Sequence, residues 1–281
     1  MHLDKPFKDL FIYYIEGRLK SSVSINQDGF IGNWEEDGYS FLFYEKPSLD
    51  KVEALLDKET HLKLIDDYEM TWEDWLGGKV KAFSAGCFHI VPPWEKDAVI
   101  ENDRHILYLH PGVVFGTGTH PTTSDCLRAV EWAAKVSLIK TAVDLGAGTG
   151  ILSLAAAKLG ISKVLAVDLN LLAVKTAKIN IDINRLERNV IAVQGDALTF
   201  ISHEADLLIA NIHYDIMKRL VADEGFLAKK IFILSGLLRS EAKIVIGMLK
   251  SMPVAIDDIR ETDGVWYTIS GRVNGFITQF P

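Results

Sequence analysis

Residues 141–168 read TAVDLGAGTGILSLAAAKLGISKVLAVD, and this stretch decides the fold. The apolar run 141–145 predicts a buried strand, residues 146–150 a glycine-rich turn, and residues 151–160 a helix. A second apolar run, 163–168, predicts another buried strand. A strand, a crossover helix and a second strand form a unit in which the two strands are parallel.

The same alternation of apolar strands and helices continues on both sides of this unit. Upstream, Thr122 or Thr123 is expected to cap a helix that runs to about Lys135. Downstream, a helix is expected at LLAVKTAKINIDIN (171–184), and strands at VIAVQGD (190–196), DLLIANI (206–212) and KKIFILSG (229–236). Such a pattern is typical of a mostly parallel sheet covered by helices on both faces.

The end of the chain has a different pattern. Val254–Thr262 and Val265–Val273 are predicted strands, joined by Asp263-Gly264, a dipeptide typical of tight β-hairpins. We therefore expect an α/β fold with a doubly wound, mostly parallel, seven-stranded Rossmann-like sheet and an antiparallel hairpin at its edge.

The N-terminal part of the chain is expected to form a small α+β domain. Asp9–Ile15, Gly38–Tyr44 and Val80–Val91 are predicted strands, and Ser48–Asp57 is a predicted helix capped by Ser48. We expect this domain at residues 1–95, a linker and loop at 96–120, and the large domain at 121–281.

Composition excludes several classes of protein. The chain has 281 residues, of which 48% are apolar, and a net charge of −8, which does not suit a general nucleic-acid binder. Its two cysteines, Cys87 and Cys126, favour neither a disulfide scaffold nor a cysteine-based metal site. The start MHLDKPFKDL does not resemble a targeting peptide, and no apolar run suits a membrane span. We expect a cytoplasmic protein with no metal, no membrane contact and no direct nucleic-acid partner.

The negative charge is concentrated in residues 35–76. This acidic stretch holds thirteen acidic and four basic residues, so its net charge is 4 − 13 = −9. It forms either a solvated face or a docking surface for a basic partner, since charge of one sign steers oppositely charged ligands.

The turn after the first strand of the large domain has the features of a ligand-binding loop. It begins at Asp144 and carries glycines at Gly146, Gly148 and Gly150. A dinucleotide-binding fingerprint would need glycine at 151, where the chain has Ile151, and a phosphate-binding Walker loop would need a following lysine. The glycines still allow a ligand to approach the backbone closely.

Two acidic residues follow the next two strands. Asp168 ends the second strand, where a carboxylate can accept both hydroxyls of a ribose, and Asp196 follows the third, where it can face an adenine. A strand-end aspartate can equally be a helix cap. Together with the glycine loop they predict an adenosine-containing ligand that needs no pyrophosphate, which S-adenosylmethionine matches. The alternative is a nicotinamide or nucleotide cofactor.

A longer signature lies upstream of the glycine loop. Residues 111–123 read PGVVFGTGTHPTT, and with Trp72–Trp75, Ile90–Trp94, Ala210–Ile212 and Leu234–Gly236 they resemble the ribosomal protein L11 methyltransferase family. That family belongs to the class I S-adenosylmethionine-dependent methyltransferases.

The resemblance implies a function for each predicted domain. It implies that residues 1–95 recognise the substrate, 96–120 cover the cofactor and 121–281 bind it. It further implies cofactor contacts at Thr123, Gly146, Asp168 and Asn211. Thr119 to Thr123 lead into a helix N-terminus, which favours a carboxylate such as that of the cofactor's methionine part.

Asn211 follows the fourth strand of the large domain, where the resemblance places the methyl acceptor. A carbonyl oxygen there can orient an amine for in-line methyl transfer, in which positioning is the main catalytic effect. His213 is a candidate proton acceptor, or else a residue of the pocket wall, and Tyr214 either faces the acceptor or packs. Trp94, Phe115 and His120 are further candidates for the acceptor side.

The sequence therefore predicts an N-methyltransferase that acts on lysine or N-terminal amines of a basic, large-subunit ribosomal protein. One alternative is a methyltransferase for another protein lysine or for a small-molecule amine. The other is a non-catalytic protein that binds S-adenosylmethionine.

Overall fold

The computed structural model describes residues 5–19, 28–98, 104–118 and 120–275. The chain divides into a small compact unit, Met1–Lys81 with Asn170–Leu172, and a large compact unit, Ala82–Leu169 with Ala173–Pro281. The division at Lys81 comes earlier in the chain than the boundary expected at residue 95, because the strands that follow Lys81 pair within the large unit.

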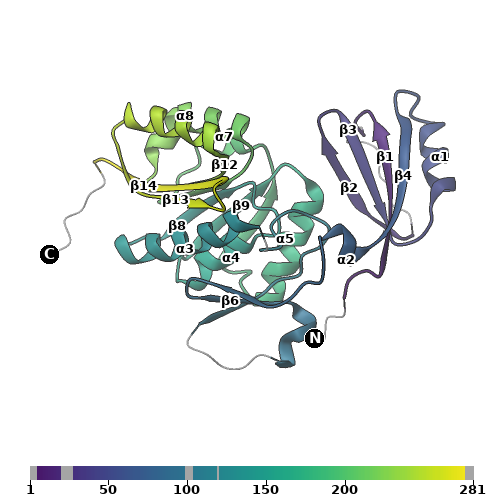
Figure 1. Ribbon diagram of the computed structural model, residues 1–281, viewed down its shortest axis with the longest axis horizontal. Helices are drawn as coiled ribbons and strands as arrows, with labels where there is room; N and C mark the ends of the chain where they lie inside the picture. Colours follow the sequence, from purple (N-terminus) through teal and green to yellow (C-terminus); the bar gives the residue numbers. More distant parts are fainter. Residues whose placement is uncertain (1–4, 20–27, 99–103, 119, 276–281) are drawn as a thin grey trace. The chain divides into compact units, whose positions relative to one another are not determined.

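The small unit is built on a four-stranded antiparallel sheet in the order β2-β3-β1-β4 (Figure 1). Its strands are β1 (Asp9–Glu16), β2 (Phe30–Glu36), β3 (Tyr39–Tyr44) and β4 (Lys63–Thr71). The strands predicted at Asp9–Ile15 and Gly38–Tyr44 are confirmed as β1 and β3. The edge strand β4 is mostly exposed and carries Asp66, Asp67 and Glu69.

Helix α1 (Leu49–Leu56) packs its buried Val52 against Tyr13, Leu42 and Tyr44 of this sheet. Ser48 precedes the helix as expected, although its hydroxyl donates to the Lys46 carbonyl rather than capping a helical N–H. The four-residue helix α2 (Trp72–Trp75) follows β4.

The strand predicted at Val80–Val91 is wrong in its extent. The structure has two antiparallel strands there, β5 (Phe83–Ala85) and β6 (Phe88–Val91), because Gly86, with φ of +57°, turns the chain between them. Strand β6 also pairs in parallel with β7 (His105–Tyr108), and the short helix η1 (Pro93–Ala98) lies between them in sequence.

The large unit contains the predicted seven-stranded sheet, in the order β10-β9-β8-β11-β12-β14-β13. Five strands are parallel: β8 (Thr141–Leu145), β9 (Lys163–Asp168), β10 (Val190–Gln194), β11 (Leu207–Asn211) and β12 (Ile231–Leu238). Strands β9 and β10 follow β8 on one side of it, and β11 and β12 lie on its other side. The carboxyl ends of β8 and β11 therefore lie side by side, at the point where such sheets bind ligands.

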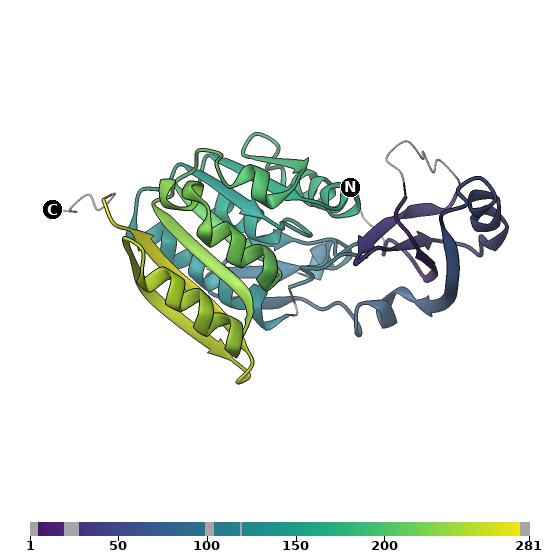
Figure 2. The same ribbon diagram turned by 90° about the horizontal axis from the view of Figure 1, so that it is seen from above.

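The hairpin at the end of the chain is confirmed. Strands β13 (Val254–Thr262) and β14 (Trp266–Val273) are antiparallel, and β14 also pairs antiparallel with β12. Asp263 and Gly264 have φ of +56° and +69°, the left-handed conformation typical of tight hairpin turns, and with Val265 they connect the paired residues Thr262 and Trp266. Figure 2 shows this yellow hairpin at one edge of the sheet.

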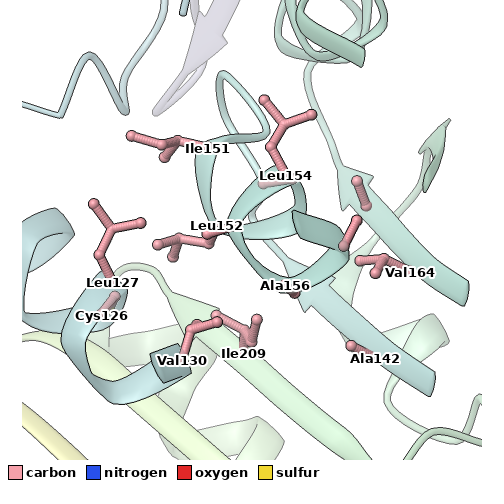
Figure 3. Close-up of a cluster of buried hydrophobic side chains, with 14 of the residues drawn as sticks. Cys126, Leu127, Val130, Ala142, Ile151, Leu152, Leu154, Ala156, Val164 and Ile209 are labelled. Atoms are coloured by element: carbon pink, nitrogen blue, oxygen red, sulfur yellow. The ribbon is translucent and has the colours of Figure 1, made fainter. Parts of the chain in front are cut away.

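Helices cover both faces of this sheet. On one face α3 (Pro121–Val136), α4 (Ile151–Lys158) and α5 (Leu171–Asn184) form a cluster that includes Leu127, Val130, Leu154 and Ile209 (Figure 3). The other cluster involves α6 (Ala197–Phe200), α7 (Tyr214–Ala222), α8 (Arg239–Lys250) and the adjoining helix η2 (Glu224–Ala228). Among the described residues, no helix is long and apolar enough to cross a membrane.

Two glycines outside the site give a matched test of this packing. A methyl group added at Gly271 of β14 would overlap the Ala255 carbonyl oxygen and come within 2.5 Å of Phe232 Cζ, whereas Gly247 of α8 has no such neighbour within 4 Å. We expect Gly271→Ala to lower the free energy of unfolding by about 1–3 kcal/mol. We expect Gly247→Ala to raise it by about 0.5–1 kcal/mol, since alanine favours a helix. Urea denaturation measures both effects, and equal effects of the two substitutions would contradict the close packing around Gly271 of β14.

Candidate functional site

The glycine loop between β8 and α4 is held in place by backbone hydrogen bonds. The N–H groups of Gly146 and Ala147 donate to the Val167 carbonyl at 2.8 and 3.0 Å, which ties the loop to β9. Gly148 has φ of +55°, and a Cβ there would lie 2.5 Å from the Phe115 carbonyl oxygen. Position 148 therefore requires glycine, as its place in the motif predicts.

The upstream signature meets the glycine loop directly. The N–H of Thr149 donates to the Phe115 carbonyl at 3.2 Å, and the Thr149 hydroxyl donates to the Gly116 carbonyl at 2.6 Å. The two motifs, which are separate in sequence, thus form one surface at the carboxyl edge of the sheet.

Asp168 lies at the end of β9, as expected. Its Oδ2 accepts a hydrogen bond from the N–H of Gly148 at 2.9 Å, so the carboxylate helps to hold the glycine loop. Its contact with a ribose stays a prediction. Asp196 precedes α6 and caps it, because its Oδ1 accepts the N–H of Leu198 at 2.9 Å. Its contact with an adenine likewise stays a prediction.

Asp144 is a buried carboxylate beneath the glycine loop. Its Oδ2 accepts a hydrogen bond from the Ser153 hydroxyl of α4 at 2.6 Å, while its buried Oδ1 has no partner among the described residues. Burial raises the pKa of Asp144 to about 7, with a smaller contribution from the negative charge of Asp168 and an opposing one from the Ser153 hydrogen bonds. Such a group favours a cationic or hydrogen-donating ligand.

Another buried oxygen without a hydrogen-bond partner among the described residues, besides Asp144 Oδ1, lies at the N-terminus of α3. Thr123 is buried, and its Oγ1 has no hydrogen-bond partner among the residues described. The expected cap at Thr122 or Thr123 is wrong: His120 is the N-cap, and Pro121 takes the first helical position, which suits its missing N–H. Thr119, predicted to bind the cofactor, lies outside the described residues.

Asn211 ends β11 and faces the start of α3. Its Nδ2 lies 3.3 Å from Thr122 Oγ1, which in turn lies 2.7 Å from His120 Nδ1. The His120 ring packs edge-on against the Trp266 ring at 4.7 Å between centroids and near the Phe115 ring at 5.4 Å. The structure therefore brings Asn211 together with an aromatic cluster.

His213, the other residue expected to act in catalysis, is the N-cap residue of α7 and is exposed. Asn211 Nδ2 lies next to Thr122, which in turn contacts His120, and the catalytic role of His213 stays a prediction. Trp266 belongs to no motif. Its pairing could still have indicated its place in the site. Trp266 begins β14 opposite Leu238, at the carboxyl end of β12, which is the ligand-binding edge of the sheet.

The described residues fit S-adenosylmethionine. The buried oxygens of Asp144 and Thr123, beside the glycine loop and at the start of α3, have no hydrogen-bond partner among the described residues. Acceptors of this kind match the cofactor's ammonium and hydroxyl groups.

Comparison with known proteins identifies the family. The model of the family "Ribosomal protein L11 methyltransferase (PrmA)" matches residues 42–274. The chain belongs to this family.

Related proteins agree with this assignment. Over 183 residues, 63% of the chain, it is 38% identical to a ribosomal protein L11 methyltransferase of Anoxybacillus flavithermus. Over 210 residues, 73% of the chain, it is 34% identical to one of Bacillus cereus. These matches span 58% and 66% of the relatives' own lengths, less than two thirds of each.

A solved structure shows the same fold. The ribosomal protein L11 methylase of Lactobacillus delbrueckii subsp. bulgaricus superposes with a TM-score of 0.56 at 27% sequence identity. The match covers 66% of this chain and 94% of that one. The expected Rossmann-like fold is confirmed.

Proposed function

We propose that the chain is an S-adenosylmethionine-dependent N-methyltransferase that methylates lysine or N-terminal amines of ribosomal protein L11. Membership of the family carries the proposal, and the fit of the site supports it. When bound, S-adenosylmethionine supplies an electrophilic methyl group. Thr123, Gly146, Asp168 and Asn211 would hold it, with Asp144 beneath the loop.

The residues of the chain act mainly by positioning. The Asn211 amide can accept a hydrogen bond from the acceptor amine and so aim its lone pair. The amine must be neutral to react, and its desolvation beside the rings of His120 and Trp266 would disfavour its charged form.

The test is methyl transfer from isotopically labelled S-adenosylmethionine to purified ribosomal protein L11, read by peptide mass spectrometry. We expect whole-methyl increments on lysine residues or on the N-terminus. Label that enters only small amines, or only other proteins, would show that the methyl acceptor is not ribosomal protein L11. Cofactor binding with no transfer to any component of a cell extract would contradict an enzymatic function.

We further propose that the small unit recognises the protein substrate through its acidic stretch, residues 35–76. The edge strand β4 supports this, since it exposes Asp66, Asp67 and Glu69 and its outer edge pairs with no strand of the four-stranded sheet. A basic partner would therefore be attracted by charge.

We expect a rise in salt from about 50 to 300 mM to weaken the binding of ribosomal protein L11 to the holoenzyme, because screening shortens the range of these charges. The substitutions Asp66→Asn, Asp67→Asn and Glu69→Gln together should make the salt dependence shallower. A control variant removes three exposed charges of the large unit, at Glu187, Glu204 and Glu224. Calorimetry measures the affinities, and equal slopes in both variants would show that the acidic stretch is only a solvated face.

A further inference from the structure

The hydrogen bonds of His120 define which of its ring nitrogens carries a proton. The backbone N–H of Thr122 points to His120 Nδ1 at 3.4 Å, and Thr122 Oγ1 lies 2.7 Å from the same atom. A backbone N–H can only donate, so Nδ1 must be the unprotonated acceptor. Burial also lowers the pKa of His120, which keeps the ring neutral at neutral pH.

The direction of the next hydrogen bond follows from this. Because Nδ1 carries no proton, the Thr122 hydroxyl must donate its single proton to His120. The remaining lone pairs of Thr122 Oγ1 can then only accept, and the atom that lies 3.3 Å away must be a donor. That atom is Nδ2 of Asn211, and an Asn211 oxygen in its place would face a second acceptor without a proton between them.

The Asn211 oxygen therefore faces the other way, toward β12. A Cβ added at Gly236 would lie 3.1 Å from Asn211 Oδ1 and 2.9 Å from the Ile212 carbonyl oxygen, so the glycine of the Leu234–Gly236 motif leaves this side uncrowded. We propose that Thr122 and His120 are positioning residues, which fix the amide of Asn211 with its oxygen presented to the methyl acceptor. This inference rests on the proposed function, because it assumes an amine acceptor next to Asn211.

The orientation matters for the chemistry of an amine. An amide oxygen accepts an N–H of the neutral amine and leaves the nitrogen lone pair available to form the new N–C bond. A flipped amide would present its NH₂ group instead, which donates to that lone pair and competes with the reaction. A network that prevents the flip therefore raises the fraction of productive complexes.

Paired substitutions at Thr122 test this function. Valine has nearly the shape of threonine and no hydroxyl, so Thr122→Val should lower kcat by about 10- to 100-fold. Thr122→Ser keeps the hydroxyl, and its kcat should lie within about threefold of wild type. His120→Phe keeps an aromatic ring against Trp266 but lacks Nδ1, and it should lower kcat in the same way as Thr122→Val. Cofactor affinity, measured by calorimetry, should change little in the valine and serine variants.

A second readout does not depend on activity. The ¹⁵N chemical shifts of the His120 ring in the wild-type protein should show the proton on Nε2. A proton on Nδ1 would overturn the inference, and so would a wild-type kcat in Thr122→Val or equal losses in the valine and serine variants. If the wild-type protein transfers no methyl group to any amine, the proposed function fails, while the ring spectrum still reports on the hydrogen-bond network.

Discussion

Asp168→Ala is expected to weaken S-adenosylmethionine binding by about 2–3 kcal/mol, roughly 30- to 150-fold, the size of a lost hydrogen bond to a charged group. Two effects combine in this variant. The alanine no longer holds the glycine loop through the N–H of Gly148, which now meets Asp168 Oδ2 at 2.9 Å. It also lacks the carboxylate that is predicted to accept the ribose hydroxyls.

Asp168→Asn separates these two effects. The asparagine oxygen can still accept the N–H of Gly148, but the side chain has lost its charge and one acceptor. We therefore expect an affinity between those of the wild type and Asp168→Ala. Isothermal titration calorimetry with S-adenosylmethionine measures all three proteins. An affinity of Asp168→Ala equal to wild type would contradict the cofactor assignment itself.

The large sheet was predictable because its signals are local. Buried parallel strands are continuous apolar runs, and Asp263-Gly264 specifies a turn by its own backbone preferences. The small unit shows the limit of such signals. Strand β4 is an exposed edge strand with no alternation of apolar and polar residues, so only its pairing with β1 reveals it. Likewise, the turn at Gly86 divides an apolar stretch that sequence alone joins into one strand.

The site also has one part that local sequence signals predict and another that they do not. The glycine loop and Asp168 come from one strand–helix–strand unit, and the motif spacing therefore points to both. The network around Asn211 joins residues 89 positions apart in the chain, and Trp266 reaches it from the terminal hairpin. Contacts of this kind depend on how the strands are ordered in the sheet. Sequence spacing contains no such information, which is why His120 could be named only as a candidate.

Asp144 is expected to make the stability of the cofactor-free protein fall as pH rises from about 4 to about 7. Its pKa is about 7 in the folded chain, against an ordinary value of 3.8 for an aspartate, and burial is the main cause. Between these values the folded state binds a proton that the unfolded state has lost, so the free energy of unfolding decreases with pH. Above pH 7 the free energy of unfolding is lower than below pH 4 by on the order of 4 kcal/mol.

Asp144→Asn removes this titration while its oxygen can still accept the Ser153 hydroxyl. The variant should therefore show a flatter dependence of stability on pH between about 4 and 7, as measured by urea denaturation. Parallel curves for the variant and the wild type would show that another group titrates in this range.

The same carboxylate should link cofactor binding to proton release. A cationic ligand next to Asp144 favours its charged form and lowers its pKa, so binding below pH 7 expels the proton. We expect the affinity of the wild type to rise about tenfold more than that of Asp144→Asn between pH 6 and pH 8. Calorimetry in buffers of different ionisation enthalpy counts the released protons. If the two proteins release equal numbers at pH 6, Asp144 does not face the charged part of the ligand, and its unpaired oxygen must be explained by the fold alone.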